Sequence, residues 1–226
     1  YTNKVEKSLF TKAKSRNFID ELTLEKLKSL NLPPSLRSTD SEFIRRIYLD
    51  TIGVLPTSDE TRSFLADTSS KKRDALIEKL LQRPEFVDYW TYKWSDLLLV
   101  SSTAVNGRQR LSSTATWTYF NWIRQNVAAN TPWDKFVSKI ITAQGSTLEN
   151  GAGNFYSLHD NPTDRAENVS QAFLGMSINC AKCHNHPMEK WTNDEYYQFA
   201  NLFSRVRSKN GSGGDGDNII FVATSG

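Results

Sequence analysis

The chain has 226 residues, which is long enough to bury a substantial hydrophobic core. Hydrophobic residues make up 38% of the sequence and charged residues 23%, so the composition indicates a globular protein and excludes an intrinsically disordered one. No apolar run approaches the ~18–20 residues that span a bilayer. The formal net charge of +3 is too small to argue for nucleic-acid binding, and we expect no nucleic-acid partner.

The sequence predicts a series of helices, because apolar residues recur at helical spacing between clear start and stop signals. Thr57 and Glu60 form a capping box, and Thr192 and Glu195 form a second one. Pro84 is typical of the first position of a helix. The predicted helices run over 18–30, from 40–41 to 53, from 57, from 69–70 to 83, over 84–99, 114–129, 132–143 and 163–176, and from 192 to 203.

The remaining segments are predicted to be irregular. Residues 145–162 and 210–217 are rich in Gly and Asn and are expected to form loops, and 219–222 is expected to be one short strand without a visible partner. The predicted fold class is mainly α, an irregular multi-helix domain of roughly eight or nine helices. We divide the chain into an N-terminal extension, a helical domain, and a Gly-rich loop that begins a continuing region; these are 1–16, 17–207 and 208–226.

One motif near the C-terminus carries clear chemistry. Cys180, Cys183 and His184 form C-x-x-C-H, the attachment pattern of c-type haem. Two thiols three residues apart lie on one turn of the chain, so each can add to one haem vinyl group while the adjacent histidine faces the iron as proximal ligand. Chance is a poor explanation, because two Cys and three His in 226 residues predict roughly 0.0002 such motifs. The sequence therefore predicts haem c as the cofactor.

The second axial ligand is a separate question. His159 lies 21 residues before Cys180 and is the candidate for the opposite haem face, with a loop histidine as the plainer interpretation. The alternatives are an open iron site, which permits small-molecule binding or peroxide chemistry, and a ligand from outside this chain. His186 is too close to His184 to reach that face easily. It is a candidate to line a haem edge, bind a separate metal or relay protons, or simply to cap the turn before Thr192.

Other interpretations of the two cysteines stay open. Cys180, Cys183, His186 and His159 offer two thiolates and two imidazoles to zinc or another metal. A reversible redox pair is a second possibility, although such pairs normally lie in a βαβ context, and a structural disulfide or two unreactive thiols is a third. Six Trp, eight Tyr and 12 Phe leave a polysaccharide-related module as a further alternative. No Ser/His/Asp signature, phosphate loop or H-E-x-x-H motif assigns an enzyme class.

A wider pattern extends over nearly the whole chain from Asn17 onward. It is carried by segments 17–20, 43–50, 53–57, 80–81, 84–86, 89–90, 94–98, 167–170, 173–175, 180–187, 191–192 and 194–203. On these segments the sequence resembles the planctomycete cytochrome-associated domain of unknown function. One departure is Met188, which follows His186-Pro187 where the family pattern has Phe. A family-wide ligand role for Met188 is therefore not implied.

The resemblance implies a cytochrome-type domain near the N-terminus of a large secreted protein, which continues into a second large domain. Haem attachment also takes place outside the cytoplasm, so we expect an extracytoplasmic location: periplasmic, cell-surface or secreted. The first residue, Tyr1, is expected to follow a removed leader or a longer preceding chain. The predicted function is an exported electron-transfer domain. Its predicted partner is a redox protein or the C-terminal domain of the same full-length chain.

Overall fold

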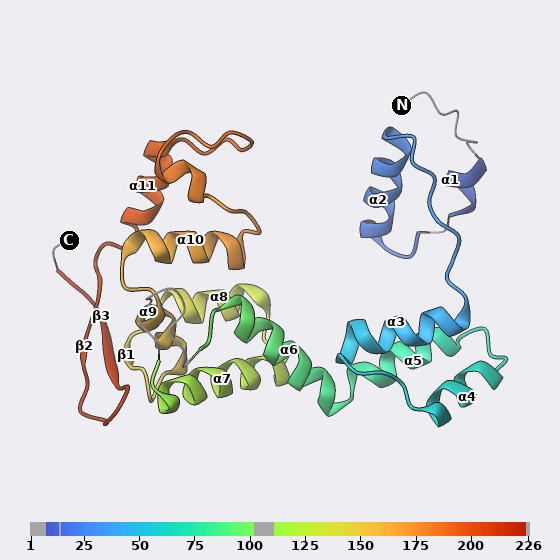
Figure 1. Cartoon of the computed structure of the whole chain (residues 1–226), viewed down its shortest axis with the longest axis horizontal. Helices are drawn as coiled ribbons and strands as arrows, with labels where there is room; N and C mark the ends of the chain where they lie inside the picture. The colour runs from blue at the N-terminus through green and yellow to red at the C-terminus, as the bar shows by residue number, and fades with distance from the viewer. Residues whose placement is uncertain (1–7, 14, 102–110, 225–226) are drawn as a thin grey trace. The chain divides into compact units, whose positions relative to one another are not determined.

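The structure is a computed structural model that describes residues 8–13, 15–101 and 111–224, and it is mainly α-helical, as predicted (Figure 1). The described residues form eleven α-helices: α1 (Ser8–Lys12), α2 (Phe18–Ser29), α3 (Asp40–Ile52), α4 (Ser58–Ala66), α5 (Lys72–Leu81), α6 (Pro84–Leu97), α7 (Ser113–Ala128), α8 (Trp133–Ile141), α9 (Asn154–Leu158), α10 (Pro162–Phe173) and α11 (Asn193–Asn201). None of them is both long and apolar enough to cross a membrane.

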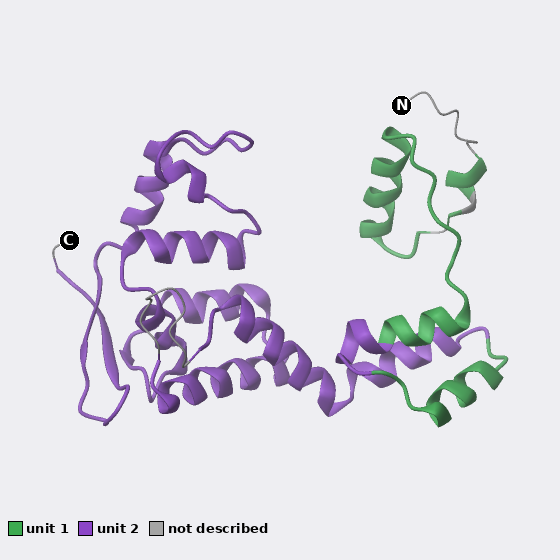
Figure 2. Cartoon of the chain, in the orientation of Figure 1, with its two compact units in different colours: residues 1–47, 55–69 green, residues 48–54, 70–226 purple. Residues whose placement is uncertain are grey.

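The chain divides into two compact units, which Figure 2 colours separately. The first comprises residues 1–47 and 55–69, and the second comprises residues 48–54 and 70–226. In the first unit, the apolar side chains of α2 recur at helical spacing, but none of its residues is buried. Phe18, for example, is 69% exposed. The C-x-x-C-H motif lies in the second unit, which also holds the main core.

Local start signals predicted the helix boundaries well. The capping box at Thr57 is present, because its hydroxyl accepts from the Glu60 amide while the Glu60 carboxylate accepts from the Thr57 amide. Pro84 is the first residue of α6, as expected. The predicted start at 69–70 is two to three residues early: the Ser69 amide donates to the side chain of Asp67, and α5 begins only at Lys72.

The core of the second unit is assembled from one face each of α7, α8, α10 and α11, and from α9. Tyr119 and Ile123 of α7 are fully buried, and Phe136 and Ile140 of α8 pack in the same cluster. The fully buried Phe155 of α9 lies in this cluster as well. Because α9 is buried on every side, its sequence lacks the polar face by which helices are usually predicted.

Tyr119 offers a test of this core. Its side chain is completely buried, and its hydroxyl has no hydrogen-bond partner among the residues that the structure describes. We expect Tyr119→Phe to raise the free energy of unfolding by about 1 kcal/mol, because the buried hydroxyl loses its water without gaining a partner. Tyr156→Phe is the matched control and should destabilise the protein by a similar amount, since its hydroxyl donates to the Ile141 carbonyl at 2.6 Å. Urea unfolding of both variants measures the change in free energy of unfolding. Equal destabilisation by the two substitutions would contradict the statement that the Tyr119 hydroxyl has no partner.

A small antiparallel sheet corrects one prediction. The expected strand exists as β3 (Asn218–Val222), but it has two partners, β2 (Val206–Asn210) and β1 (Gly145–Ser146), in the order β1-β3-β2. Ser208 pairs with Ile220, and Gly145 pairs with Ile220 from the other side. The partners escaped prediction because β2 is polar and largely exposed, with no alternation of apolar residues, and β1 is only two residues long.

The prediction of a loop over 145–162 is also wrong in part. This segment contains β1, the short 3-10 helix η1 (Gly151–Gly153) and α9, and η1 and α9 are almost completely buried. Gly151 is required there because a Cβ atom would lie 2.7 Å from the Thr118 carbonyl oxygen of α7. The Gly and Asn residues that suggested a loop instead allow close packing and satisfy buried main-chain groups.

Asp217 closes the turn between β2 and β3. The Ser146 hydroxyl and the Gly213 amide donate to its carboxylate at 2.6 and 2.8 Å, and these bonds lower the pKa of Asp217. The stabilisation is present above the ordinary pKa of 3.8 and is lost as the pH falls through the lowered value. We expect Asp217→Asn to weaken the protein at neutral pH and to flatten this part of its acid unfolding curve. An unchanged curve would show that Asp217 does not anchor the turn.

Candidate functional site

The C-x-x-C-H motif lies on a tight turn between α10 and α11. The 3-10 helix η2 (Asn179–Lys182) contains the first cysteine, and the amides of Cys183 and His184 both point back to the Cys180 carbonyl at 3.4 Å. Both cysteines are free thiols with exposed side chains, and His184 is exposed as well. The turn therefore presents all three predicted haem-binding side chains to solvent.

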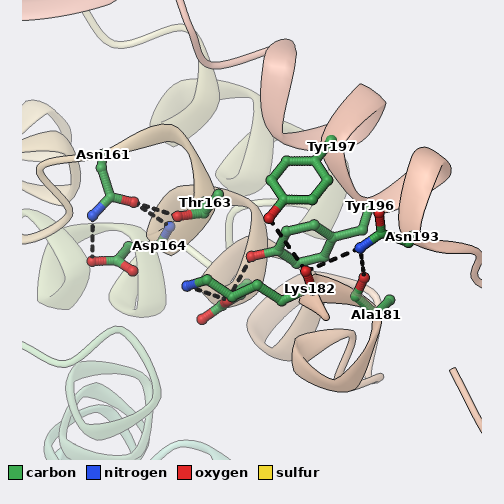
Figure 3. Close-up of polar contacts among 9 residues, drawn as sticks. Asn161, Thr163, Asp164, Ala181, Lys182, Asn193, Tyr196 and Tyr197 are labelled. Carbon is green, nitrogen blue, oxygen red and sulfur yellow. Dashed lines mark hydrogen bonds and ion pairs between the residues drawn. The ribbon is translucent and has the colours of Figure 1, made fainter. Parts of the chain in front are cut away.

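The backbone of this turn is fixed from behind by α11. Ala181 is completely buried, and its carbonyl accepts from the Asn193 side-chain amide at 2.8 Å. The Lys182 carbonyl accepts from the same amide at 3.0 Å and from the Tyr197 hydroxyl at 3.2 Å (Figure 3). The main-chain amide of Asn193 donates to the side-chain oxygen of Asn185 at 3.0 Å. Main-chain groups thus hold the turn and leave the reactive side chains unencumbered.

A second attachment runs through α10. Lys182 lies 3.5 Å from the carboxylate of Glu167, whose side chain is largely buried, and the same carboxylate accepts from the Tyr196 hydroxyl at 2.6 Å. Burial, followed by the hydrogen bond to Glu167, raises the pKa of Tyr196. Figure 3 shows Lys182 and Tyr196 converging on this point. Tyr196 thus stays a neutral hydrogen-bond donor, and the ion pair anchors the residue between the two cysteines.

The hydrogen bond of His184 fixes which of its ring nitrogens is available. Its Nδ1 lies 2.8 Å from the Asn185 carbonyl oxygen. A carbonyl can only accept, so Nδ1 carries the proton and the neutral ring keeps its lone pair on Nε2. A histidine that ligates a metal through one nitrogen typically donates its other N–H to such a carbonyl. His184 is therefore in the tautomer that a proximal ligand requires.

His186 is arranged in the opposite sense. Its Nδ1 accepts from the amides of Met188 and Glu189 at 3.2 and 3.0 Å, so the neutral ring carries its proton on Nε2. Its own amide donates to the Trp191 carbonyl at 2.7 Å. These bonds close the loop that leads into α11 and favour the capping role for His186. In this conformation neither ring nitrogen offers a free lone pair, so metal binding by His186 stays a prediction.

His159, the candidate distal ligand, lies in the core. It follows α9, is 2% exposed, and its ring packs on Phe155 with centroids 4.7 Å apart. Its carbonyl accepts from the Arg165 guanidinium at 2.7 Å. His159 would have to leave this packing to meet a haem held at the exposed turn. Its ligand role therefore stays a prediction.

The ligands that an all-protein metal site needs do not gather among the described residues. Over 8–13, 15–101 and 111–224, no three His, Cys, Asp or Glu side chains gather to hold a metal ion. The zinc interpretation with Cys180, Cys183, His186 and His159 requires four such ligands in one place. Covalent haem requires two accessible thiols and one imidazole with a free Nε2, and the turn presents these side chains.

Sequence reasoning missed the residues that hold the turn. Two of them, Asn193 and Tyr197, bind main-chain carbonyls of the turn. The third, Glu167, pairs with Lys182 from α10. One signal was present, because the capping box at Thr192 and Glu195 fixes the start of α11 and makes Asn193 its first residue. That Asn193 then faces the Cys180–Cys183 turn follows only from the packing of α11 against it.

Comparison with known proteins identifies a family but no activity. A family model described as "PSCyt2: Protein of unknown function (DUF1549)" matches residues 18–208, which is most of the chain. No curated protein matches the sequence, and no solved structure matches the fold. The argument for a cofactor therefore depends on the residues of this chain.

Proposed function

The chain belongs to the PSCyt2 family, described as a protein of unknown function, and we propose that its exposed C-x-x-C-H turn carries one covalently attached c-type haem. The observation that carries this proposal is the hydrogen bond from His184 Nδ1 to the Asn185 carbonyl, which leaves Nε2 free for iron. The exposed thiols of Cys180 and Cys183 support it, because attachment requires that both reach the haem edge.

The chemistry of attachment balances without an oxidant. Each thiol adds across one haem vinyl group, so a sulfur–carbon bond forms and the thiol proton passes to the other vinyl carbon. The protein holds the two sulfur atoms on one turn through the Ala181 and Lys182 carbonyls, and it orients His184 through Asn185. Haem, when bound, supplies reversible one-electron chemistry at its iron.

The role that follows is electron transfer in an exported protein. Attachment of c-type haem takes place outside the cytoplasm, so the domain would work in the periplasm, at the cell surface or in the medium. Its redox partner would be another protein or a C-terminal domain of the same full-length chain. An exposed attachment turn supports this role, because electron transfer requires that a partner approach the cofactor closely.

The test is a pyridine haemochrome spectrum of the 226-residue chain, exported from a host with cytochrome c maturation. We expect a c-type spectrum that survives acid-acetone extraction. Cys180→Ala and Cys183→Ala should each retain one thioether and give a shifted spectrum, and the double variant should retain no covalent haem. Met188→Leu is the matched control at an exposed neighbouring position and should leave the spectrum unchanged.

The negative outcome is equally clear. The positive control is a c-type cytochrome exported from the same host, which shows whether haem attachment works there. A folded but colourless chain from that host would overturn the haem proposal. Metal analysis of the same sample would then distinguish the two alternatives. One zinc ion per chain would support the zinc site, and no bound metal would support a plain thiol pair.

A further inference from the structure

The second unit contains a cavity that no residue of the C-x-x-C-H turn lines. It measures about 550 Å³, within the range of roughly 300–1,000 Å³ that small-molecule sites occupy. One side is formed by three aromatic residues of α6 spaced four residues apart, Phe86, Trp90 and Trp94, and the other by the turn between α7 and α8 and the start of α8.

The aromatic rings hold each other in place. Trp133 lies 4.4 Å from Trp94 between ring centroids and stacks on Phe136 at 5.4 Å, with the planes 14° apart. Phe173 of α10 meets Trp133 edge-on at 5.7 Å. Even so, Trp133 remains 41% exposed. The Trp133 indole is therefore exposed to solvent and already held in one orientation. A ligand that binds to it loses little free energy to ordering of this side chain.

The polar groups at this cavity are neutral. No Asp, Glu, Lys or Arg is among the described residues that line it. Asn130 is exposed and has a φ of 46°, so its amide stands on a sharp turn between α7 and α8. Asn126 is already used, since its Nδ2 donates to the Trp122 carbonyl and its Oδ1 accepts from the Thr131 hydroxyl and from the Lys139 ammonium, which does not itself line the cavity. The polar group available to a ligand is thus the Asn130 side-chain amide at the rim, and the inside of the cavity is formed by aromatic rings.

We propose that this cavity binds a carbohydrate, with a sugar ring against Trp133 and its hydroxyl groups bonded to Asn130 at the rim. A pyranose presents C–H groups on its faces and neutral hydroxyls at its edge, and this combination matches aromatic walls with an amide rim. Aromatic faces also attract cations, but the Lys139 ammonium donates to the lining residue Asn126 at 3.0 Å and places a positive charge there. A purely apolar ligand would leave the rim amide unused. The proposal is independent of haem.

The test is calorimetric titration of the 226-residue chain with cellotetraose, chitotetraose and mannotetraose, and with choline as the cationic probe. We expect saturable binding of at least one oligosaccharide and none of choline. Trp133→Ala should raise Kd by roughly tenfold or more, because stacking on this ring is lost. Trp117→Ala is the matched control, since Trp117 of α7 is 63% exposed and does not line the cavity.

Two further readouts keep the test decisive if Trp133→Ala does not fold. In the wild-type chain, titration should shift the indole N–H resonances of Trp94 and Trp133 but not that of Trp117. Asn130→Gly keeps the positive φ accessible and removes only the amide, so it should weaken binding without loss of fold. Binding of choline alone, equal loss in Trp117→Ala, or no saturable binding below about 10 mM would overturn the proposal.

Discussion

His184→Ala is expected to lower the yield of stable, covalently loaded protein by roughly tenfold or more, whereas His186→Ala should load almost normally. The two rings are only two residues apart, but their hydrogen bonds assign them opposite roles. His184 donates to a carbonyl and keeps Nε2 free, while His186 accepts from two amides. Loss of His186 should instead cost about 1 kcal/mol of stability, because two main-chain amides lose their acceptor.

The same contrast is measurable without haem. Nitrogen-15 spectra of the two rings in the haem-free chain should show His184 protonated on Nδ1 and His186 protonated on Nε2. In a second experiment, the yield of covalently loaded protein is compared between His184→Ala and His186→Ala in the maturation-competent host. Equal haem yields from both variants would remove His184 from the proximal position, and reversed tautomers would contradict the structural assignment itself.

Arg165→Met is expected to lower the free energy of unfolding by about 3–5 kcal/mol, which makes it the largest stability effect that we predict. Arg165 is 3% exposed, and burial lowers its pKa. Its guanidinium donates to the carbonyls of four residues and lies over the Tyr156 ring, 5.2 Å from the centroid. The carbonyls belong to His159 and Asp160 before α10, to Phe203 after α11, and to Val206 at the start of β2.

The large expected cost follows from what the substitution leaves behind. Methionine fills much of the same volume but satisfies none of the four carbonyls, and Arg165→Lys cannot reproduce the fork geometry. Arg124→Met is the matched control. Arg124 pairs with Asp88 at 3.1 Å on the surface, and the loss should be under about 1 kcal/mol. Urea unfolding measures both; similar losses for Arg165 and Arg124 would show that Arg165 does not tie these segments together.

The sequence predicted those elements whose signals are local. The two capping boxes and Pro84 mark helix starts that the structure confirms, because a cap depends on residues only three positions apart. The polar strand β2 and the buried helix α9 were missed, because their stability comes from residues distant in sequence. β1 pairs with β3 across more than seventy positions, and no periodic pattern in a two-residue strand can reveal this.

The candidate site shows the same division. Residue types and spacing predicted that Cys180, Cys183 and His184 act as one chemical unit. The sequence could not tell that His184 and His186 use opposite ring nitrogens, because this depends on which main-chain groups surround each ring. Nor could it tell that His159 lies in the core, since that is decided by the packing of α9.

The way α11 holds the C-x-x-C-H turn determines which residues of the turn can vary among related sequences. Asn193 and Tyr197 bind carbonyl oxygens, which every amino acid supplies, so the clamp itself places no demand on the side chains between the cysteines. Ala181 is limited to small residues because its methyl group is fully enclosed. Lys182 is constrained in another way, because its ammonium pairs at 3.5 Å with the largely buried carboxylate of Glu167. The residues found at these two positions therefore report how the turn is packed and say little about what it binds.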